Sequence, residues 1–325
     1  MKKKILLGCG AFLLLCVAAA GVLAFLLFHR VEGQYFDANG VRIHYTVEGK
    51  GEPVILVHGL GTNADLNWRR PGVTAALRRD FQVIMFDCRG HGLSDRPTEP
   101  EKYGMELGAD VIRLMDHLGI EQAHIAGYSM GGFIVLKLLE THPQRFQSAA
   151  VCAAGWKRPD DDRPLPNPYK PPPPEDASRN TLNATMPTLI PAFAAPRGPI
   201  HALRNWVDDR INDRSALKAL KKSSELMVIP EEVLRNNTVP TICFIGDRDG
   251  FLPYARDLQR VMAQLEFVVL PGVNHLTTPM QPAFRRGLRD FFNRHRMSEN
   301  EKAPPTARLE RDERLKMCAV LDMEQ

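Results

Sequence analysis

The sequence lacks the cysteine patterns that mark a metal or redox site. Its 325 residues include only six cysteines, and no two of them form a C-x-x-C pair, so a zinc or redox motif has no support. Cys152 and Cys243 lie within apolar runs, where cysteine behaves as a small core residue. We therefore predict neither a metal nor a cofactor.

An excess of charge of one sign is also missing. The formal net charge is only +4, and part of it comes from the three lysines at positions 2–4. A nucleic-acid-binding face is therefore not predicted. Hydrophobic residues make up 44% of the chain and charged residues 25%, as in ordinary folded proteins. The length allows one large domain with additional segments, and there are no internal repeats.

One long apolar run is present, from Ile5 to Phe28, with lysines before it and Arg30 after it. As a helix it would be about 36 Å long, enough to cross a hydrocarbon core of roughly 30 Å. A cleaved signal peptide needs a shorter apolar region, and neither Cys9 nor Cys16 is well placed for a lipid anchor. We predict an uncleaved signal anchor, which is a single transmembrane helix. Its lysines would stay cytoplasmic, so the remaining chain would lie on the extracytoplasmic side.

Beyond the anchor, apolar strand-like runs alternate with segments of helical periodicity. Residues 34–48 form a predicted β-hairpin around Asn39-Gly40. The alternation predicts an α/β fold, a mostly parallel twisted sheet with helices on both faces. The expected strands are 54–57, 81–86, 123–126, 148–154, 241–245 and 266–270. The expected helices are 63–79 (broken at Pro71-Gly72), 103–118, 133–140, 254–265 and 282–295.

The alternation stops at Gly155 and resumes near residue 238. The roughly 80 residues between are rich in proline and charge, and a long connection of this kind in a compact domain is typical of a lid or of disorder. We interpret it as a cap that contains a helix at 203–220. The predicted organisation is 1–30 signal anchor, 31–155 first part of the core, 156–237 cap, 238–296 second part of the core, and 297–325 tail without an assigned function.

The most informative motif is Gly127-Tyr128-Ser129-Met130-Gly131, which lies between a predicted strand and a predicted helix. In this setting Gly-x-Ser-x-Gly is typical of a nucleophile elbow, a tight turn that exposes the serine hydroxyl above the sheet. Side chains at the two glycines would clash as the backbone folds back on itself. Ser129 is therefore the predicted nucleophile.

A serine nucleophile requires a base and a group that orients the base. Asp249 follows the strand 241–245, and His275 follows the strand 266–270. The order nucleophile, acid, histidine is the one found in α/β-hydrolases. Asp249 lies deeper in its loop than Asp247, for which we predict a loop-capping role. No acid follows the strand 148–154, where the other common arrangement would have one.

An oxyanion that develops on a bound carbonyl needs two backbone N–H donors. Met130 follows the nucleophile and is one predicted donor. The other is predicted in the loop after the strand 54–57, at Leu60, where Gly59 and Gly61 allow a sharp turn. His58 is interpreted as an organiser of this loop and not as a base.

The segment Asp87 to Asp95, with His58-Gly59, the elbow and His275, resembles the α/β-hydrolase superfamily over roughly residues 34–295. The resemblance is nearest to capped serine esterases, including the membrane-anchored monoacylglycerol lipase type. It implies that Arg89 and His91 belong to a supporting loop near the site, which His91 and Asp95 hold in place. Epoxide hydrolases and haloalkane dehalogenases carry aspartate at the elbow, so Ser129 argues against them.

The leading expectation is a serine hydrolase of carboxylic esters, an esterase or lipase acting on small-molecule or lipid esters and possibly on acylglycerols. A carbon–carbon bond hydrolase of the same fold would use the same three residues and remains an alternative. A non-catalytic binding protein is the alternative from another class, because a fold alone does not determine function. Loss of one of the three residues would favour it, and all three are present.

Overall fold

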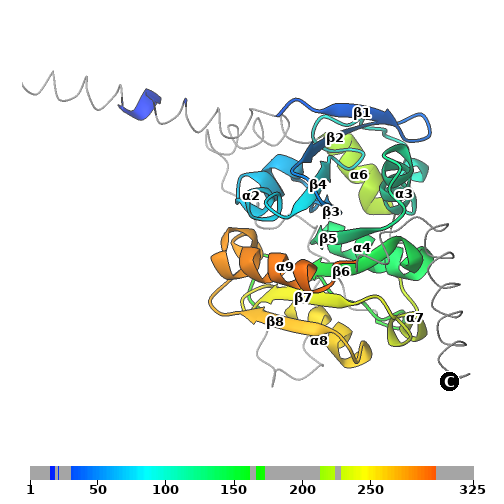
Figure 1. Ribbon diagram of the computed structural model, residues 1–325, viewed down its shortest axis with the longest axis vertical. Coiled ribbons are helices and arrows are strands. Elements are labelled where there is room, and N and C mark those ends of the chain that lie inside the picture. The colour runs from blue at the N-terminus through cyan, green and yellow to red at the C-terminus, as the bar shows by residue number, and fades with distance from the viewer. Residues whose placement is uncertain are drawn as a thin grey trace, which may run out of the picture.

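The computed structural model describes residues 15–18, 21, 31–161, 166–172, 213–223 and 228–297 (Figure 1). Its strands are β1 (Gln34–Asp37), β2 (Arg42–Glu48), β3 (Glu52–Val57), β4 (Phe81–Phe86), β5 (Ala123–Tyr128), β6 (Phe146–Cys152), β7 (Thr241–Gly246) and β8 (Glu266–Leu270). Its longer helices are α3 (Glu106–His117), α4 (Met130–Thr141), α6 (Arg214–Lys222), α8 (Leu252–Val261) and α9 (Pro282–Arg294). Its short helices are η1 (Asp65–Arg69), α2 (Val73–Leu77), η2 (Pro100–Lys102), η3 (Pro143–Arg145), α7 (Glu231–Arg235) and η5 (Thr278–Met280).

The strands form one eight-stranded sheet in the order β1-β2-β4-β3-β5-β6-β7-β8. The pairs β1–β2 and β2–β4 are antiparallel, and all later pairs are parallel. After β3 the chain moves outward to β4 and then returns to place β5 on the other side of β3. This reversal brings the carboxyl ends of β3 and β5 together, which is where open α/β sheets place their ligand sites. The mostly parallel α/β sheet expected from the sequence is confirmed.

The predicted hairpin is present as β1 and β2, paired from Gln34–Tyr45 to Asp37–Arg42. Asn39 and Gly40 both have positive φ, 60° and 77°, as hairpin turns with the correct twist require. The Gly40 N–H also donates to Asp37 Oδ1 at 2.7 Å. A local sequence signal was sufficient here because the turn chemistry is local.

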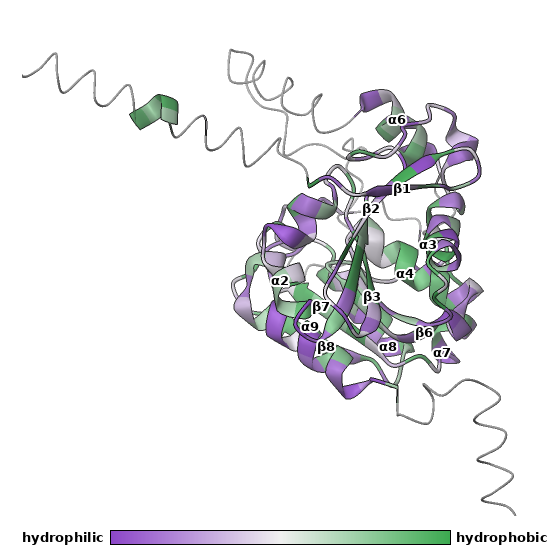
Figure 2. Ribbon diagram, turned by 45° about the horizontal axis from the view of Figure 1, so that its top comes forward, coloured by the Kyte–Doolittle hydropathy of each residue, from purple (hydrophilic) through white to green (hydrophobic). Residues whose placement is uncertain are grey.

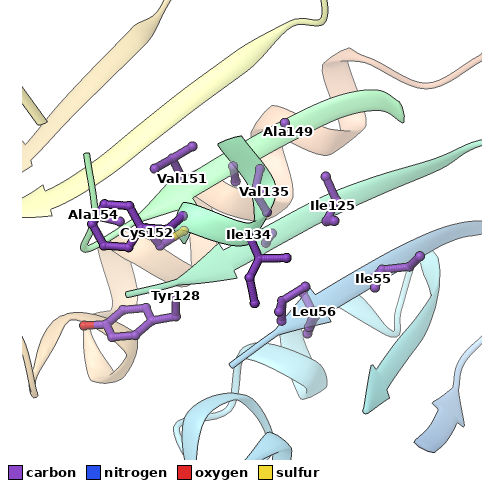
Figure 3. Packing of buried hydrophobic residues seen from close by; sticks show 14 of the residues in the cluster. Ile55, Leu56, Ile125, Tyr128, Ile134, Val135, Ala149, Val151, Cys152 and Ala154 are labelled. Atoms are coloured by element: carbon purple, nitrogen blue, oxygen red, sulfur yellow. The ribbon is translucent and has the colours of Figure 1, made fainter. Parts of the chain in front are cut away.

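Helices cover both faces of the sheet. Figure 2 shows α2 and α9 on one side of the central strands and α3 and α4 on the other, and each pair is in mutual contact. The helix α4 begins directly after the Ser129 turn and contacts β3, β5 and β6. Figure 3 shows Ile134 and Val135 of α4 packed among Leu56, Ile125 and Val151 from these strands, and all five side chains are fully buried. Burial of such side chains contributes about 1.5–3 kcal/mol each, so the elbow is supported by a fully buried part of the core.

The two ends of the insertion after β6 lie next to each other. Trp156 at its start is buried, its indole N–H donates to the Ile229 carbonyl at 2.9 Å, and its backbone N–H donates to the Tyr254 carbonyl at 3.0 Å. Within the predicted helix 203–220 the structure describes residues 213–220, where α6 begins at Arg214 and continues to Lys222. The role of residues 156–237 as a cap stays a prediction.

The predicted membrane segment falls almost entirely outside the described residues, as does the tail beyond residue 297. In the part of the chain that the structure describes, no helix combines the length and the hydropathy that crossing a membrane requires.

Candidate active site

The candidate site lies where the sheet topology reverses. The loop after β3 carries His58 to Gly61, and the turn after β5 carries Ser129, while β3 and β5 are paired with Val57 opposite Gly127. The loops after β7 and β8 carry Asp249 and His275. All four loops follow the carboxyl ends of parallel strands, so residues far apart in the sequence meet at one edge of the sheet.

Ser129 occupies a backbone conformation that residues other than glycine rarely adopt, with φ 53° and ψ −114°. Strained conformations of this kind cluster at functional sites, where the surrounding structure holds them. A Cβ atom at Gly127 would lie 2.0 Å from the Gly131 carbonyl oxygen, and one at Gly131 would lie 2.2 Å from the Val57 carbonyl oxygen. Both glycines of the motif are therefore needed for the close approach of α4, β5 and β3.

Ser129, His275 and Asp249 form a continuous chain of hydrogen bonds. The His275 Nδ1 atom lies 2.8 Å from Asp249 Oδ2, and its Nε2 atom lies 3.0 Å from Ser129 Oγ. A carboxylate only accepts hydrogen bonds, so Nδ1 carries the proton and Nε2 is free to accept the hydroxyl proton of Ser129. This geometry allows His275 to activate the serine as a general base.

The two aspartates after β7 have different surroundings. Asp249 is fully buried, and its second carboxylate oxygen accepts the Phe251 N–H at 2.9 Å. Asp247 is exposed and accepts the Val273 N–H at 3.2 Å, which joins its loop to the one that carries His275. The structure therefore places Asp249 against His275 and Asp247 at the loop-capping position that the sequence suggested.

The backbone N–H groups of Leu60 and Met130 flank the elbow. On either side of Leu60, the Gly59 N–H donates to Asn67 Oδ1 at 2.8 Å and the Gly61 N–H donates to His91 Nε2 at 3.1 Å. Among the described residues no hydrogen-bond acceptor is found for the N–H groups of Leu60 and Met130. Donors of this kind are what an oxyanion hole provides.

His58 and His91 are both buried and have both ring nitrogens engaged. His58 Nε2 accepts the Cys88 N–H at 2.9 Å, so its Nδ1 donates to the Gly59 carbonyl at 2.7 Å. His91 Nδ1 lies 3.1 Å from the Arg89 carbonyl. Burial and the neighbouring His58 lower the pKa of His91 to about 3, so it is neutral near pH 7 and able to accept from Gly61. Each histidine therefore binds backbone groups of neighbouring loops. This is the position expected for His58 from the sequence and for His91 from the family resemblance.

Arg89 connects the supporting loop to α3. Its guanidinium donates to both carboxylate oxygens of Asp110 at 2.7 and 2.6 Å, and to the Lys102 carbonyl at 2.6 Å. Arg89 and Asp110 are both buried, and such bidentate pairs impose geometry as well as stability. Arg89 therefore joins the supporting loop to α3.

Sequence reasoning missed the central role of Asp87. Its carboxylate accepts the N–H groups of Ala64 and Leu93 at 2.9 Å each and lies 3.2 Å from His44 Nδ1. Burial raises the pKa of Asp87, but the hydrogen bond with His44, the nearby His58 and the two N–H groups lower it to about 2. Asp95, expected to hold this loop, does so from a more exposed position, where it accepts the Arg42 N–H at 2.8 Å. The sequence signals for Asp87 were its place directly after a buried strand and its place at the start of the segment that carries the family resemblance, and neither indicated its partners.

Three aromatic rings surround the imidazole of His275. The ring centroids of Tyr128, Tyr169 and Phe251 lie 5.6, 5.7 and 5.7 Å from that of His275. Tyr128 at the end of β5 is labelled in Figure 3, and its hydroxyl donates to the His275 carbonyl. Burial and the charge of Asp249 raise the pKa of Tyr169. The three rings pack around an imidazole that is itself buried.

Known proteins share this fold and parts of this sequence. RutD of Azorhizobium caulinodans, a carbamate hydrolase by name, is 35% identical over 126 residues, which is 39% of this chain and 46% of RutD. The 3-oxoadipate enol-lactonase 2 of Acinetobacter baylyi is 37% identical over 122 residues, 37% of this chain and 44% of the lactonase. The matched region thus spans less than half the length of these relatives.

A similar result comes from solved structures. A mutant form of the meta-cleavage product hydrolase CumD aligns with a TM-score of 0.62 and 24% identity, over 81% of this chain and 98% of CumD. A likeness at this identity concerns the fold. Residues 52–236 match the family of the alpha/beta hydrolase fold, which is more than half of the chain. This protein is therefore a member of the alpha/beta hydrolase fold family.

Proposed function

We propose that this protein is a serine hydrolase that cleaves carboxylic esters through an acyl-enzyme. The observation that supports this most strongly is the chain of hydrogen bonds from Ser129 Oγ through His275 to Asp249. The N–H groups of Leu60 and Met130 belong to the same site and have no acceptor among the described residues. A nucleophile, a base, an acid and candidate oxyanion donors therefore occur in one place. This combination is the physical requirement for acyl transfer.

In the proposed reaction, Ser129 Oγ attacks the ester carbonyl while His275 Nε2 takes its proton. Asp249 holds the Nδ1–H tautomer and stabilises the imidazolium. The carbonyl oxygen becomes an oxyanion that accepts from Leu60 and Met130. His275 then returns the proton to the leaving alcohol oxygen as the carbon–oxygen bond breaks, and water hydrolyses the acyl-enzyme by the same steps.

The surroundings of His275 favour an apolar substrate. Leu276 is 62% exposed, Met280 is 58% exposed and Tyr169 is 36% exposed, and all three lie in or against the segment that carries His275. Exposed large apolar side chains gathered in one place are typical of a ligand-binding surface. These side chains support the proposal that the substrates are esters with apolar acyl groups, including lipid esters. They also support the capped lipase type that the sequence resembles.

A carbon–carbon bond hydrolase is the second candidate. The likeness to a meta-cleavage product hydrolase extends over four-fifths of the chain, and such an enzyme would employ the same Ser129, His275 and Asp249. A binding protein on this scaffold is less well supported, because it has no need of an intact, buried Asp249 aligned on His275.

The test uses the domain without Met1 to Arg30. We expect a fluorophosphonate probe to label Ser129, because the probe reacts only with an activated serine, and we expect turnover of p-nitrophenyl esters of graded chain length. The chain-length optimum separates long-chain from small-ester use. Labelling without ester turnover would favour the carbon–carbon candidate, and the absence of labelling would refute the serine hydrolase.

The same deletion tests the proposed anchor. The apolar run Ile5–Phe28 supports a single membrane span with the catalytic domain on the extracytoplasmic side. We expect the full chain in the membrane fraction and the deleted chain in the soluble fraction, each with the same kcat for a water-soluble ester. If the deleted chain stayed with the membrane, the insertion or the tail would have to contain a second anchor.

A further inference from the structure

A buried side chain with no role in the proposed reaction accepts a hydrogen bond from the loop after β3. Asn67 is buried, and its Oδ1 atom accepts the Gly59 N–H at 2.8 Å. It lies in η1, eight residues beyond Gly59, and belongs to none of the motifs that carry the site. A buried amide that holds a backbone N–H near a nucleophile affects the geometry of that backbone.

Gly59 lies directly beside the nucleophile. A Cβ atom at Gly59 would be 3.3 Å from the Ser129 Cβ atom and 3.3 Å from the Tyr128 carbonyl oxygen. The peptide that follows Gly59 carries the Leu60 N–H. A small rotation of the Gly59 backbone therefore changes the direction of that N–H relative to Ser129.

The donors on both sides of Leu60 already have partners. Asn67 occupies the Gly59 N–H, and His91 Nε2 accepts the Gly61 N–H at 3.1 Å. The carbonyl of Gly59 accepts from His58 Nδ1 at 2.7 Å. Both ends of the Leu60 segment are thus held, and the Leu60 N–H has no acceptor among the described residues.

The helix η1 holds the Asn67 amide firmly in place. Its backbone makes a wide turn, with the Arg70 N–H donating to the Asp65 carbonyl at 2.9 Å. Single π-type turns of this kind often occur at functional sites. The Trp68 ring packs edge-on against Tyr128 with centroids 6.0 Å apart, and Arg69 donates to Glu48 at 2.9 Å. The elbow and β2 therefore fix the helix from two sides.

We propose that Asn67 is a positioning residue for the oxyanion hole. It holds Gly59 through one hydrogen bond and so aims the Leu60 N–H at the oxygen that becomes negative when Ser129 attacks. This inference rests on the proposed serine hydrolase. It adds a residue that acts through the backbone without touching the substrate.

The test is Asn67→Leu, which keeps the approximate shape of the side chain and removes the acceptor. We expect kcat for a p-nitrophenyl ester to fall about 10- to 100-fold with KM nearly unchanged, as for a misplacement of catalytic groups by a fraction of an ångström. The affinity for an arylboronic acid should fall by a similar factor, because its tetrahedral adduct with Ser129 places a negative oxygen in the oxyanion hole. Amide hydrogen exchange of the peptide that contains Gly59 should become faster.

Asn63→Ala is the matched control. Asn63 Oδ1 accepts the Leu66 N–H at 3.0 Å in the same segment, and among the described residues the Gly59 N–H is bound by Asn67 and not by Asn63. A similar loss of kcat and boronate affinity in both variants would reduce Asn67 to a structural role and overturn the inference, as would an unchanged kcat in Asn67→Leu. The wild-type chain is first labelled with fluorophosphonate and assayed. An inactive, unlabelled wild type would defeat the proposed function itself, whereas an active wild type with an unaffected variant would defeat this inference alone.

Discussion

Ser129→Ala is expected to lower ester turnover about 10⁶-fold while the protein stays folded, as for loss of a serine nucleophile whose partners act as a unit. The hydroxyl is the group that attacks, and its one hydrogen-bond partner given by the structure is His275. Alanine adds no atoms to the crowded turn. Steady-state kinetics and a thermal melt check the two parts of the prediction, and fluorophosphonate labelling should disappear. Retained turnover would show that another residue is the nucleophile.

Ser148→Ala is the matched control, because the chain contains a second buried serine–histidine pair. Ser148 Oγ lies 2.8 Å from His124 Nδ1, and His124 Nε2 lies 3.3 Å from Glu52. These residues lie toward the amino ends of β5, β6 and β3, away from the elbow, and Ser148 is fully buried. We expect Ser148→Ala to lower the melting temperature and to leave kcat within about twofold, since loss of a buried hydrogen bond costs about 1–3 kcal/mol.

Asp249→Asn is expected to reduce kcat about 10⁴-fold with a small change in KM. An asparagine amide facing His275 would donate to Nδ1, which places the imidazole proton on Nε2. A protonated Nε2 cannot accept the hydroxyl proton of Ser129. The buried position of Asp249, 2.8 Å from Nδ1, keeps water from substituting for the carboxylate. Steady-state kinetics on the same ester measure the effect.

Asp247→Asn provides the comparison at a neighbouring position with the same chemistry. Its side chain is exposed, and among the described residues its hydrogen-bond partner is the Val273 N–H, which an asparagine oxygen can accept as well. We expect kcat within about threefold of the wild type, because surface substitutions of this kind have small effects. If the large loss instead followed Asp247→Asn, the catalytic acid would have to be reassigned to Asp247.

Much of the fold was predictable because the signals are local. The strands β4 and β8 have the bounds expected from their apolar runs. For β4 the reason is burial on both faces, which makes a strand continuously apolar, whereas β8 is a partly exposed strand at the edge of the sheet. The hairpin turn at Asn39-Gly40 needs positive φ at both residues, and few residue types adopt it. The helix α6 extends two residues beyond the expected end, and α7 was not anticipated. Short helices owe their stability to tertiary contacts more than to their own residues.

The sequence alone was sufficient to predict the order of Ser129, Asp249 and His275 along the chain. It also predicted that each of them follows a parallel strand, here β5, β7 and β8. Because parallel strands have their carboxyl ends at the same edge of the sheet, residues that follow these strands lie close together in space. Tertiary structure alone decided that Asn67 reaches Gly59, that Asp87 holds three partners, and that Ser148 with His124 is a buried pair remote from the elbow. Those contacts join side chains whose types are common in any sequence. Whether such side chains meet depends on how separate segments pack together, and no periodicity or motif within one segment specifies that packing.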